Sequence, residues 1–312
     1  MMPSLSIVIP THQRTDLLQA CLASVTRHAP AETQVIVVDD GSPAATASAI
    51  ARSFGAEAVR LPARHGFCAA ANAGIRAAQG EVVELLNDDT EVTAGWAEAA
   101  LSAFRDSTVA AVAPLVLAWP GDRIDSAGDR YYLGGVAGKR GHDLPVTADY
   151  LQPCRVFGVS AAAGFYRRAA LERVGLFPES FGAYFEDVDL SFRLHRAGYQ
   201  VWFEPAARVL HRGGASHGQV ARRLLEQQSR NEERVFWRNV PVLWRAVPHH
   251  LAVLAGKAWR RWNEGNLAPF VCGRLRVLGE IGALRRHRDM LSRLGPAEEV
   301  DRWQVEAAYW GR

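Results

Sequence analysis

Short apolar runs alternate with stretches of helical periodicity through the N-terminal part of the chain. In the helical stretches apolar residues recur about every 3.6 positions, as at Leu18, Cys21, Leu22 and Val25. The strand-like runs lie at 5–9, 34–38, 58–61 and 81–86. This alternation of strand and helix predicts an α/β fold with a mostly parallel central sheet and right-handed crossovers.

The pattern changes in the second half of the chain. Residues 109–117 read as a strand, 119–149 as a long loop rich in Gly, Asp and Arg, and 200–203 as a further strand. Beyond about residue 215 the sequence favours helices with breaks at prolines, namely Pro241, Pro248, Pro269 and Pro296. We therefore predict an α/β domain over residues 1–217 and a helical region over residues 218–312.

Acidic residues follow two of the predicted strands. The run 34–38 leads into Asp39 and Asp40, and the run 81–86 leads into Asn87-Asp88-Asp89. Ligands of open α/β sheets bind beyond the carboxyl ends of the strands, and crowded carboxylates there favour a cation. Mg²⁺ or Mn²⁺ takes such oxygen ligands and bridges to phosphates, so the pattern predicts a metal–diphosphate site. The structural alternatives are a helix cap at Asp40 and an acidic turn at 87–89.

A second acidic group, Glu186-Asp187-Val188-Asp189, begins a predicted helix. Acids favour a helix N-terminus in any case, which is the structural explanation. Four aromatic residues precede the group, and an acid in a partly apolar wall can act as a general base. Arg193 lies one helical turn after Asp189 and is expected to pair with it. His211, with the glycine pair Gly213-Gly214 just after it, is a candidate ligand, and His217 is a weaker one, although a lone histidine is more often structural.

Composition and charge add a contrast between the two halves of the chain. Residues 1–212 carry a balance of −4, whereas 213–312 carry +7 and hold six of the nine tryptophans. Arginine mixed with tryptophan suits an anionic membrane surface, a helix packed on the first domain, or a homodimer interface. Nucleic acid is not an expected partner, because the acidic face would repel it and no nucleic-acid motif occurs.

Targeting signals and cysteine spacing indicate the compartment. The chain shows no signal peptide and no apolar run of membrane-spanning length. Its four cysteines lack metal-ligand spacing and are expected to be reduced thiols, mostly buried: Cys21, Cys68, Cys154 and Cys272. We expect a cytoplasmic protein that can lie on the inner face of the cytoplasmic membrane.

Several motifs in order resemble a known family. The chain is similar to family 2 glycosyltransferases of the GT-A fold, in the bacterial rhamnosyltransferase-like and galactofuranosyltransferase-like branch, over about residues 4–217. The motifs that carry the resemblance are Ser6-Ile7-Val8-Ile9-Pro10, Val37-Val38-Asp39-Asp40-Gly41-Ser42, Asn72-Ala73-Gly74-Ile75, Leu85-Leu86-Asn87-Asp88-Asp89-Thr90, Tyr184-Phe185-Glu186-Asp187-Val188-Asp189-Leu190 and His211.

The resemblance implies inverting, metal-dependent sugar transfer from a UDP-, dTDP- or GDP-linked donor to a glycan or a polyprenyl-diphosphate-linked acceptor, in cell-surface polysaccharide synthesis. It implies Asp187 as the general base, Asp89 and His211 as ligands of Mg²⁺ or Mn²⁺, and a donor site that includes Thr11, Asp40, Asn72 and Asp88. Two positions depart from the family pattern: Asn87 replaces an Asp, and Arg64-His65-Gly66 replaces an N-x-G, which bears on nucleotide and sugar preference.

Two other functions are compatible with parts of the pattern. A non-catalytic carbohydrate-binding relative would be expected to lack Asp89 or Asp187, and both are present. A nucleotidyltransferase would show a Gly- and Arg/Lys-rich phosphate loop after the first strand, where this chain has Pro10-Thr11-His12-Gln13-Arg14. A nicotinamide dehydrogenase is excluded, because no G-x-G-x-x-G follows that strand.

Overall fold

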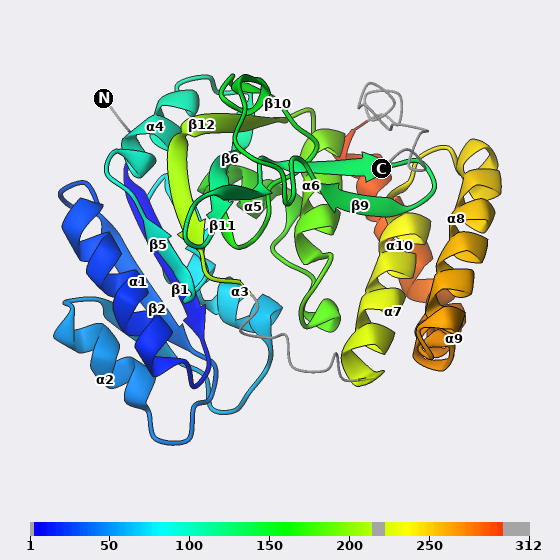
Figure 1. Cartoon of the computed structure of the whole chain (residues 1–312), viewed down its shortest axis with the longest axis horizontal. Helices are drawn as coiled ribbons and strands as arrows, with labels where there is room; N and C mark the ends of the chain where they lie inside the picture. Colours follow the sequence, from blue (N-terminus) through cyan, green and yellow to red (C-terminus); the bar gives the residue numbers. More distant parts are fainter. Residues whose placement is uncertain (1–2, 214–221, 296–312) are drawn as a thin grey trace.

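The structure, a computed structural model, describes residues 3–213 and 222–295 (Figure 1). A ten-stranded sheet forms the centre, with eight strands in the order β10-β12-β6-β11-β4-β1-β2-β3 and with β5 beside β12 and β7 beside β6. The sheet is parallel from β3 to β4, and the antiparallel β11 joins it to the parallel pair β6 and β12. The strands are β1 (Leu5–Thr11), β2 (Gln34–Asp39), β3 (Glu57–Arg60), β4 (Val82–Leu86), β5 (Thr90–Val92), β6 (Val109–Ala118), β7 (Arg123–Ser126), β10 (Cys154–Arg155), β11 (Ala163–Arg167) and β12 (Gln200–His211).

Helices cover both faces of this sheet and form two apolar cores. One core lies between the sheet and α1, α2 and α4, and the other between the sheet and α3, α5 and α6. These helices are α1 (Thr15–His28), α2 (Thr46–Ser53), α3 (Phe67–Ala77), α4 (Trp96–Ala103), α5 (Arg168–Val174) and α6 (Glu186–Arg196). This arrangement confirms the predicted α/β class. The prediction was possible because strands that are buried on both faces have continuous apolar sequences.

The segment predicted as a long loop, residues 119–149, contains strands. β7 joins the central sheet, and β8 (Asp129–Tyr132) pairs with β9 (Val136–Lys139) in a separate hairpin. The loop prediction was wrong here because these strands have four residues each and are held by neighbours distant in sequence, such as Gly158 opposite Asp129.

The predicted strand 200–203 was also too short. β12 continues to His211, and its pairing with β6 shifts register between Glu204 and Arg208. Pro205 lies in this irregular stretch, where a residue without an N–H donor is tolerated. The extension matters for function because it places His211 at the end of the strand.

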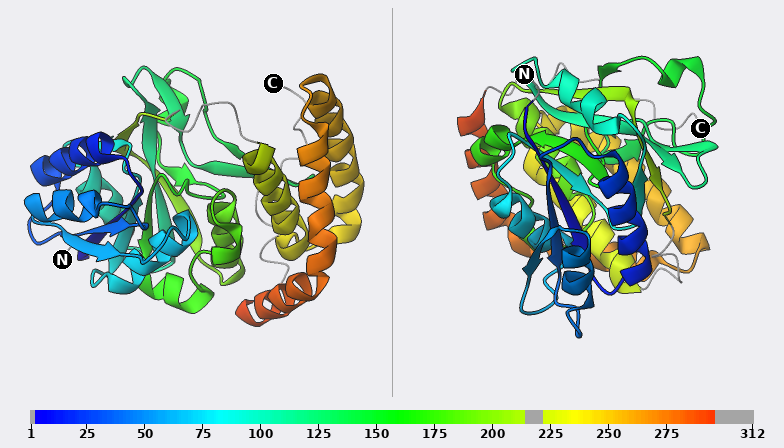
Figure 2. Two further views of the ribbon diagram at one scale, coloured as in Figure 1. Left: turned by 90° about the horizontal axis from the view of Figure 1, so that it is seen from below. Right: turned by 90° about the vertical axis from the view of Figure 1, so that its left-hand side faces the viewer.

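Four helices follow the sheet domain: α7 (Arg222–Asn239), α8 (Leu243–Asn263), α9 (Leu267–Arg276) and α10 (Ile281–Leu294), with a short 3₁₀ turn at Val277–Glu280. They lie at the end of the molecule opposite α1 and α2 (Figure 2). Pro241 separates α7 from α8 as predicted, whereas Pro248 lies inside α8 and Pro269 in the first turns of α9. Pro269 is tolerated because the N–H groups of the first helical turn have no carbonyl partner within the helix. Pro296 and His217 lie outside the described residues.

No described helix combines the length and apolarity that crossing a bilayer requires. All four cysteines are free thiols, as predicted, with Cys21 and Cys68 buried, Cys154 partly buried and Cys272 exposed.

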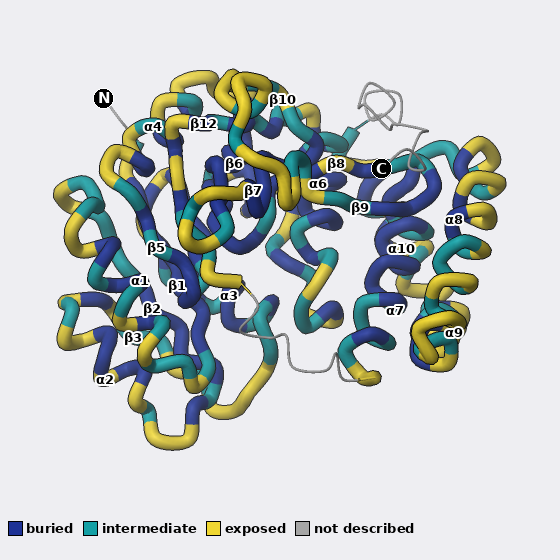
Figure 3. The backbone as a smooth tube through the Cα atoms, in the orientation of Figure 1, coloured by how far each residue is buried: buried dark blue, intermediate teal, exposed yellow. Residues whose placement is uncertain are grey.

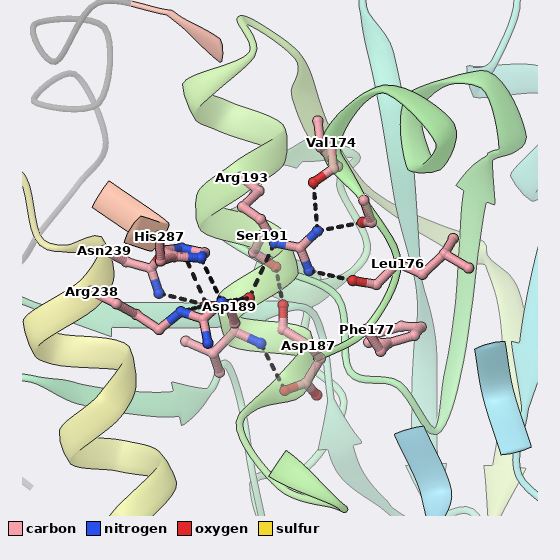
Figure 4. Close-up of polar contacts among 12 residues, drawn as sticks. Val174, Leu176, Phe177, Asp187, Asp189, Ser191, Arg193, Arg238, Asn239 and His287 are labelled. Atoms are coloured by element: carbon pink, nitrogen blue, oxygen red, sulfur yellow. Dashed lines mark hydrogen bonds and ion pairs between the residues drawn. The ribbon is translucent and has the colours of Figure 1, made fainter. Parts of the chain in front are cut away.

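The C-terminal helices are joined to the sheet domain by a buried ionic cluster around Asp189 of α6 (Figure 4). The Asp189 carboxylate lies 3.1 Å from Arg193 of the same helix and 3.0 Å from Arg238 of α7. Asn239 of α7 donates a hydrogen bond to it at 2.8 Å, and His287 of α10 lies 3.8 Å away. The predicted pairing of Asp189 with Arg193 is confirmed. Burial opposes ionisation of Asp189, but the two arginines outweigh burial and lower its pKa to about 2.

His195 of α6 makes stability depend on pH. Its ring stacks on Phe157, and its Nε2 lies 2.7 Å from the Phe157 carbonyl oxygen. Burial lowers the pKa of His195 to about 4 from its ordinary 6.5. Between these values the unfolded chain binds a proton that the folded chain excludes, so stability falls as the pH falls from 6.5 to 4. The expected loss in the free energy of unfolding is about 3 kcal/mol at pH 4.

Denaturant unfolding measured between pH 6.5 and pH 4 should show this loss of stability. His195→Gln should flatten the dependence of the unfolding free energy on pH. An unchanged slope in that variant would contradict the assignment.

Candidate active site

The acidic residues after β4 converge with the loop after β1. Asp88 accepts a hydrogen bond from the Thr11 hydroxyl at 2.6 Å. Arg14 bridges the two neighbouring carboxylates, at 3.2 Å from Asp88 and 3.1 Å from Asp89. Both aspartates are buried. Burial raises the pKa of Asp88 to about 6 despite the Thr11 hydrogen bond and the Arg14 charge. Two buried carboxylates side by side therefore require a cation, and in this structure Arg14 supplies part of that charge.

His211 reaches the same carboxylates from the end of β12. Pairing of β12 with β5 sets His211 opposite Thr90, the residue after Asp89. The Nε2 atom of His211 lies 3.2 Å from Oδ1 of Asp89, and its Nδ1 atom lies 3.0 Å from Oδ2 of Asp125. The structure thus brings together Asp88, Asp89 and His211, which the sequence predicted as one site.

The Asp89–His211 pair fits a divalent cation. Oδ1 of Asp89 is buried and lies 3.2 Å from Nε2 of His211, which pairs with it. A buried carboxylate oxygen beside a ring nitrogen is a donor set that Mn²⁺ or Mg²⁺ accepts. The described residues contain no group of three or more His, Cys, Asp or Glu side chains arranged to hold a metal. A cation here would need further oxygens, and substrate phosphates commonly supply them to Mg²⁺.

The electrostatics of His211 follow from its two acidic neighbours. Burial lowers the pKa of His211, but the hydrogen bonds and charges of Asp125 and Asp89 outweigh it and raise the pKa to about 9. Burial likewise opposes ionisation of Asp89, but His211 and Arg14 lower its pKa. At neutral pH the imidazole therefore carries a proton, which a metal at Nε2 would have to displace.

Asp125 was not among the predicted site residues. It ends up beside His211 because β7 pairs with β6 next to β12. Lys139, at the end of β9, holds both oxygens of Asp125 at 2.8 and 2.9 Å. A carboxylate on the far nitrogen of an imidazole fixes which nitrogen faces the metal and how the ring is turned. We interpret Asp125 as the residue that positions His211.

Replacing Asp125 tests this interpretation. Asp125→Asn should weaken Mn²⁺ binding by about 10- to 100-fold, because the His211 ring loses its ionic partner. Calorimetric titration with Mn²⁺ and nucleotide measures the change. Asp143→Asn is the matched control, since Asp143 is an exposed acid of the same segment that pairs with Arg123. Equal losses in both variants would show that the segment, and not the Asp125 carboxylate, determines binding.

Asp187 lies at the start of α6 in a sharply turned segment. Tyr184 and Phe185 both have positive φ, at 70° and 69°, a conformation that aromatic residues rarely adopt. Such backbone strain clusters at functional sites, where the surrounding structure maintains it. The Asp187 carboxylate accepts hydrogen bonds from the backbone N–H groups of Val188 at 2.8 Å and Ala161 at 3.1 Å.

The two acids that begin α6 both have raised pKa values. Burial raises the pKa of Asp187, and the backbone hydrogen bonds from Ala161 and Val188 oppose this rise. Burial and the nearby Asp187 charge raise the pKa of Glu186 well above its ordinary range. Two backbone N–H groups stabilise the Asp187 carboxylate, so we interpret Asp187 as the candidate proton acceptor of the pair.

Asp40 and Asn72 hold neighbouring segments in place. The Asp40 carboxylate accepts backbone hydrogen bonds from His65 at 2.7 Å and Gly66 at 2.9 Å, so it fixes the loop before α3 and does not cap α2. The Asn72 amide is buried and bonds to both the N–H and the carbonyl of Phe177. In the structure Asn72 therefore ties α3 to the segment that leads to α6.

Gly41 explains the tight turn after β2. Its φ is +68°, and a Cβ atom there would lie 2.4 Å from the backbone of Ala63. Only glycine fits this close approach, which brings residues 63–66 against the end of β2.

Comparison with known proteins identifies the family. The sequence model described as "Glycosyl transferase family 2" matches residues 6–175. The chain belongs to glycosyl transferase family 2. The matched range includes Asp40 and Asp88-Asp89, while Asp187 and His211 lie beyond it.

Sequence relatives are of several kinds. A pre-mycofactocin glycosyltransferase of Mycobacterium tuberculosis is 32% identical over 209 residues, which is 66% of this chain and 42% of that protein. An N-acetylglucosaminyl-diphospho-decaprenol L-rhamnosyltransferase of the same species is 30% identical over 240 residues, 69% of this chain and 78% of that protein. An uncharacterized protein of Sinorhizobium fredii is 32% identical, with only 25% of its length covered. The chain thus spans less than half the length of several relatives.

Solved glycosyltransferase structures share the fold. GalNAc-T7 with UDP, GalNAc and Mn²⁺ has a TM-score of 0.60 at 18% identity, over 76% of this chain and 50% of that one. A Pyrobaculum calidifontis mannosyltransferase with GDP-Man and Mn²⁺ has a TM-score of 0.59 at 17% identity, over 98% and 89%. These similarities confirm the predicted GT-A fold of this family member.

Three polar residues of the site were missed from the sequence: Arg14, Asp125 and Lys139. Arg14 had a usable signal, because it lies in the loop beyond the carboxyl end of the first strand, where ligands of such sheets bind. Asp125 and Lys139 had none, since they lie in the segment whose short strands gave no periodic pattern.

Proposed function

We propose that this chain is an inverting, divalent-metal-dependent glycosyltransferase. It moves a hexosyl or rhamnosyl-type sugar from a UDP-, dTDP- or GDP-linked donor to a hydroxyl of a glycan or a polyprenyl-diphosphate-linked acceptor, in cell-surface polysaccharide synthesis. The observation that carries the proposal is the buried Asp89–His211 pair, in which Oδ1 of Asp89 lies 3.2 Å from Nε2 of His211. The decaprenol-linked acceptor named for one relative supports the lipid-linked class.

The donor side of the reaction follows from the residues around this pair. Asp89 and His211 would hold Mn²⁺ or Mg²⁺, which when bound neutralises charge building on the diphosphate leaving group. Thr11 and Arg14 orient Asp88 next to it. Asp40 fixes residues 65–66 at the end of β2, where we expect the nucleoside. Asn72 anchors the backbone of Phe177 and so supports the segment that leads to α6. We also propose that Asn72 contacts the donor directly.

The acceptor side follows from Asp187. Its carboxylate takes the proton of the acceptor hydroxyl as that oxygen forms a bond to the anomeric carbon. The bond from the anomeric carbon to the diphosphate oxygen breaks on the opposite face, and the nucleoside diphosphate leaves. One displacement inverts the configuration, and no covalent enzyme intermediate is needed.

The division of labour along the chain is part of the proposal. Residues 1–217 supply the chemistry, and residues 218–312 support α6 through the Asp189 cluster and hold the enzyme at the inner face of the cytoplasmic membrane. The contacts of Arg238 and Asn239 with Asp189 support the role of the C-terminal helices in holding α6.

A transfer assay tests the proposed function. The protein is incubated with UDP-, dTDP- and GDP-sugars, Mn²⁺ and a short polyprenyl-diphosphate-linked glycan, and nucleoside diphosphate release is followed. The anomeric configuration of the product, determined by NMR, should be opposite to that of the donor. Retained configuration would contradict the single displacement. A folded protein that neither binds nor turns over any of the three donors would contradict the enzyme assignment.

A further inference from the structure

Helix α8 carries a stripe of large apolar side chains that face solvent. Trp244, Leu251, Trp259 and Trp262 are 80%, 60%, 71% and 67% exposed, respectively. Their spacings of seven, eight and three residues place all four on one side of a helix with 3.6 residues per turn. The four residues span nearly the whole length of α8. Helix α8 lies at the right-hand edge of the molecule in Figure 3, with many exposed positions along it. We name these four residues the tryptophan face.

The opposite side of α8 is fixed to the rest of the molecule. Ala246, His250 and Val253 are buried there. His250 lies 2.8 Å from the Gly134 carbonyl oxygen and 3.1 Å from Glu233 of α7, and Lys257 pairs with Glu232. Because these contacts hold the helix in one orientation, the tryptophan face cannot turn inward and remains an outer surface of the folded chain.

The C-terminal helices that include the tryptophan face are basic. Arg245 on α8 and Arg285, Arg286 and Arg293 on α10 are exposed, and none forms an ion pair within residues 3–213 and 222–295. The segment from α9 to α10 exposes further apolar side chains, among them Leu275 and Leu278. Indole rings combined with arginine suit the headgroup region of an anionic bilayer, where rings enter the boundary and cations meet phosphate.

We propose that the tryptophan face of α8 docks in the headgroup region of a membrane containing anionic phospholipid. A lipid surface fits better than a second copy of the chain, because two copies joined here would bring together two helical regions of the same, basic charge. An in-plane helix fixed on one side and apolar on the other is the geometry of interfacial membrane binding. The inference rests on the proposed function only in that the membrane would hold the lipid-linked acceptor.

The hairpin β8–β9 connects the packed side of α8, opposite the tryptophan face, to the active site. At its tip, Gly134 and Gly135 lie against His249 and His250 of α8. At its base, Lys139 holds Asp125, which contacts His211. A membrane bound through α8 would therefore lie at the other end of the element that supports the metal-binding histidine.

Vesicle binding tests the proposal on the full chain. Flotation with phosphatidylcholine vesicles containing phosphatidylglycerol should recover the wild type, and pure phosphatidylcholine should recover much less. Substituting Trp244, Trp259 and Trp262 together with Ala should lower the partition coefficient by about tenfold or more, because binding scales with buried apolar area. Trp119→Ala, a partly exposed tryptophan outside α8, is the matched control. Leu251→Glu, a single change in the middle of the stripe, tests the same surface with minimal risk to folding.

The outcomes separate this proposal from its rivals. Loss of vesicle binding in the triple variant and in Leu251→Glu, with the control unchanged, supports it. A wild type that does not float, or variants that float equally well, would overturn it. So would a wild-type dimer in sedimentation that the triple variant dissociates, because the face would then be a self-association surface. Binding of Mn²⁺ and nucleoside diphosphate needs no vesicle, so failure of the proposed function would appear there and not in flotation.

Discussion

Asp187→Asn should lower the rate of sugar transfer by about 10²- to 10⁴-fold and leave donor binding nearly unchanged. The loss follows from general-base catalysis, because an amide cannot accept the proton of the acceptor hydroxyl. The amide oxygen can still accept one of the two backbone hydrogen bonds from Ala161 and Val188, so the start of α6 should keep its position. Single-turnover transfer rates, measured beside calorimetric binding of nucleotide with Mn²⁺, separate the two effects.

Glu186→Gln is the matched comparison for this experiment. Burial, the main cause, raises the pKa of Glu186 well above its ordinary range, and glutamine has the same shape as a neutral glutamic acid. We expect this variant to retain most of the transfer rate. If Glu186→Gln is inactive and Asp187→Asn is active, the base is the other acid of the pair. If Asp187→Asn loses nucleotide binding as well, the carboxylate serves the donor and not the acceptor.

The parallel half of the fold could be predicted from the sequence because its signals are local. Strands β1, β2 and β4 are buried on both faces and read as unbroken apolar runs, and each ends in a loop that carries polar residues. The clustering of Asp88 and Asp89 with His211 was predictable through the family motifs alone. No local pattern shows that β12 continues past Pro205 to deliver His211 beside Thr90.

The contacts that tune the site could not be predicted because they join segments distant in sequence. Asp125 and His211 are 86 residues apart, and the strand pairing that unites them involves short strands with weak patterns. The same holds for Asp189, whose partners Arg238 and His287 come from helices that look like a separate region in the sequence. Charge pairing of this kind depends on tertiary placement, which periodicity does not encode.

The Asp189 cluster also changes how the C-terminal helices should be probed. Removing residues 218–312 would take away Arg238, Asn239 and His287 and leave Asp189 with only Arg193. Taking partners from a buried charge is strongly destabilising, so a truncated chain would confuse loss of folding with loss of function. Point substitutions on exposed positions of α8 avoid this problem, because the side of α8 that packs on the molecule stays intact.

Asp89→Ala should abolish metal-dependent nucleotide binding. Asp89 and His211 are the two side chains that we propose as ligands of the cation, and Oδ1 of Asp89 lies beside Nε2 of His211. Replacing a positioning residue behind a ligand costs about 10- to 100-fold in metal affinity, and loss of a direct ligand should cost more. Arg14 keeps its contact with Asp88, so the loop after β1 retains one anchor in this variant.

The measurement is calorimetric binding of UDP, dTDP and GDP, each with and without Mn²⁺, to the wild type and to Asp89→Ala. We expect one nucleotide to bind the wild type tightly, and only when the metal is present. Glu172→Ala, which removes an exposed carboxylate on α5, should bind like the wild type. Binding by Asp89→Ala that still depends on Mn²⁺ would place the cation elsewhere. If nucleotide binding to the wild type does not depend on Mn²⁺, the diphosphate is bound without the metal. Arg14 and His211, both cationic in the metal-free protein, would then be the groups that bind it.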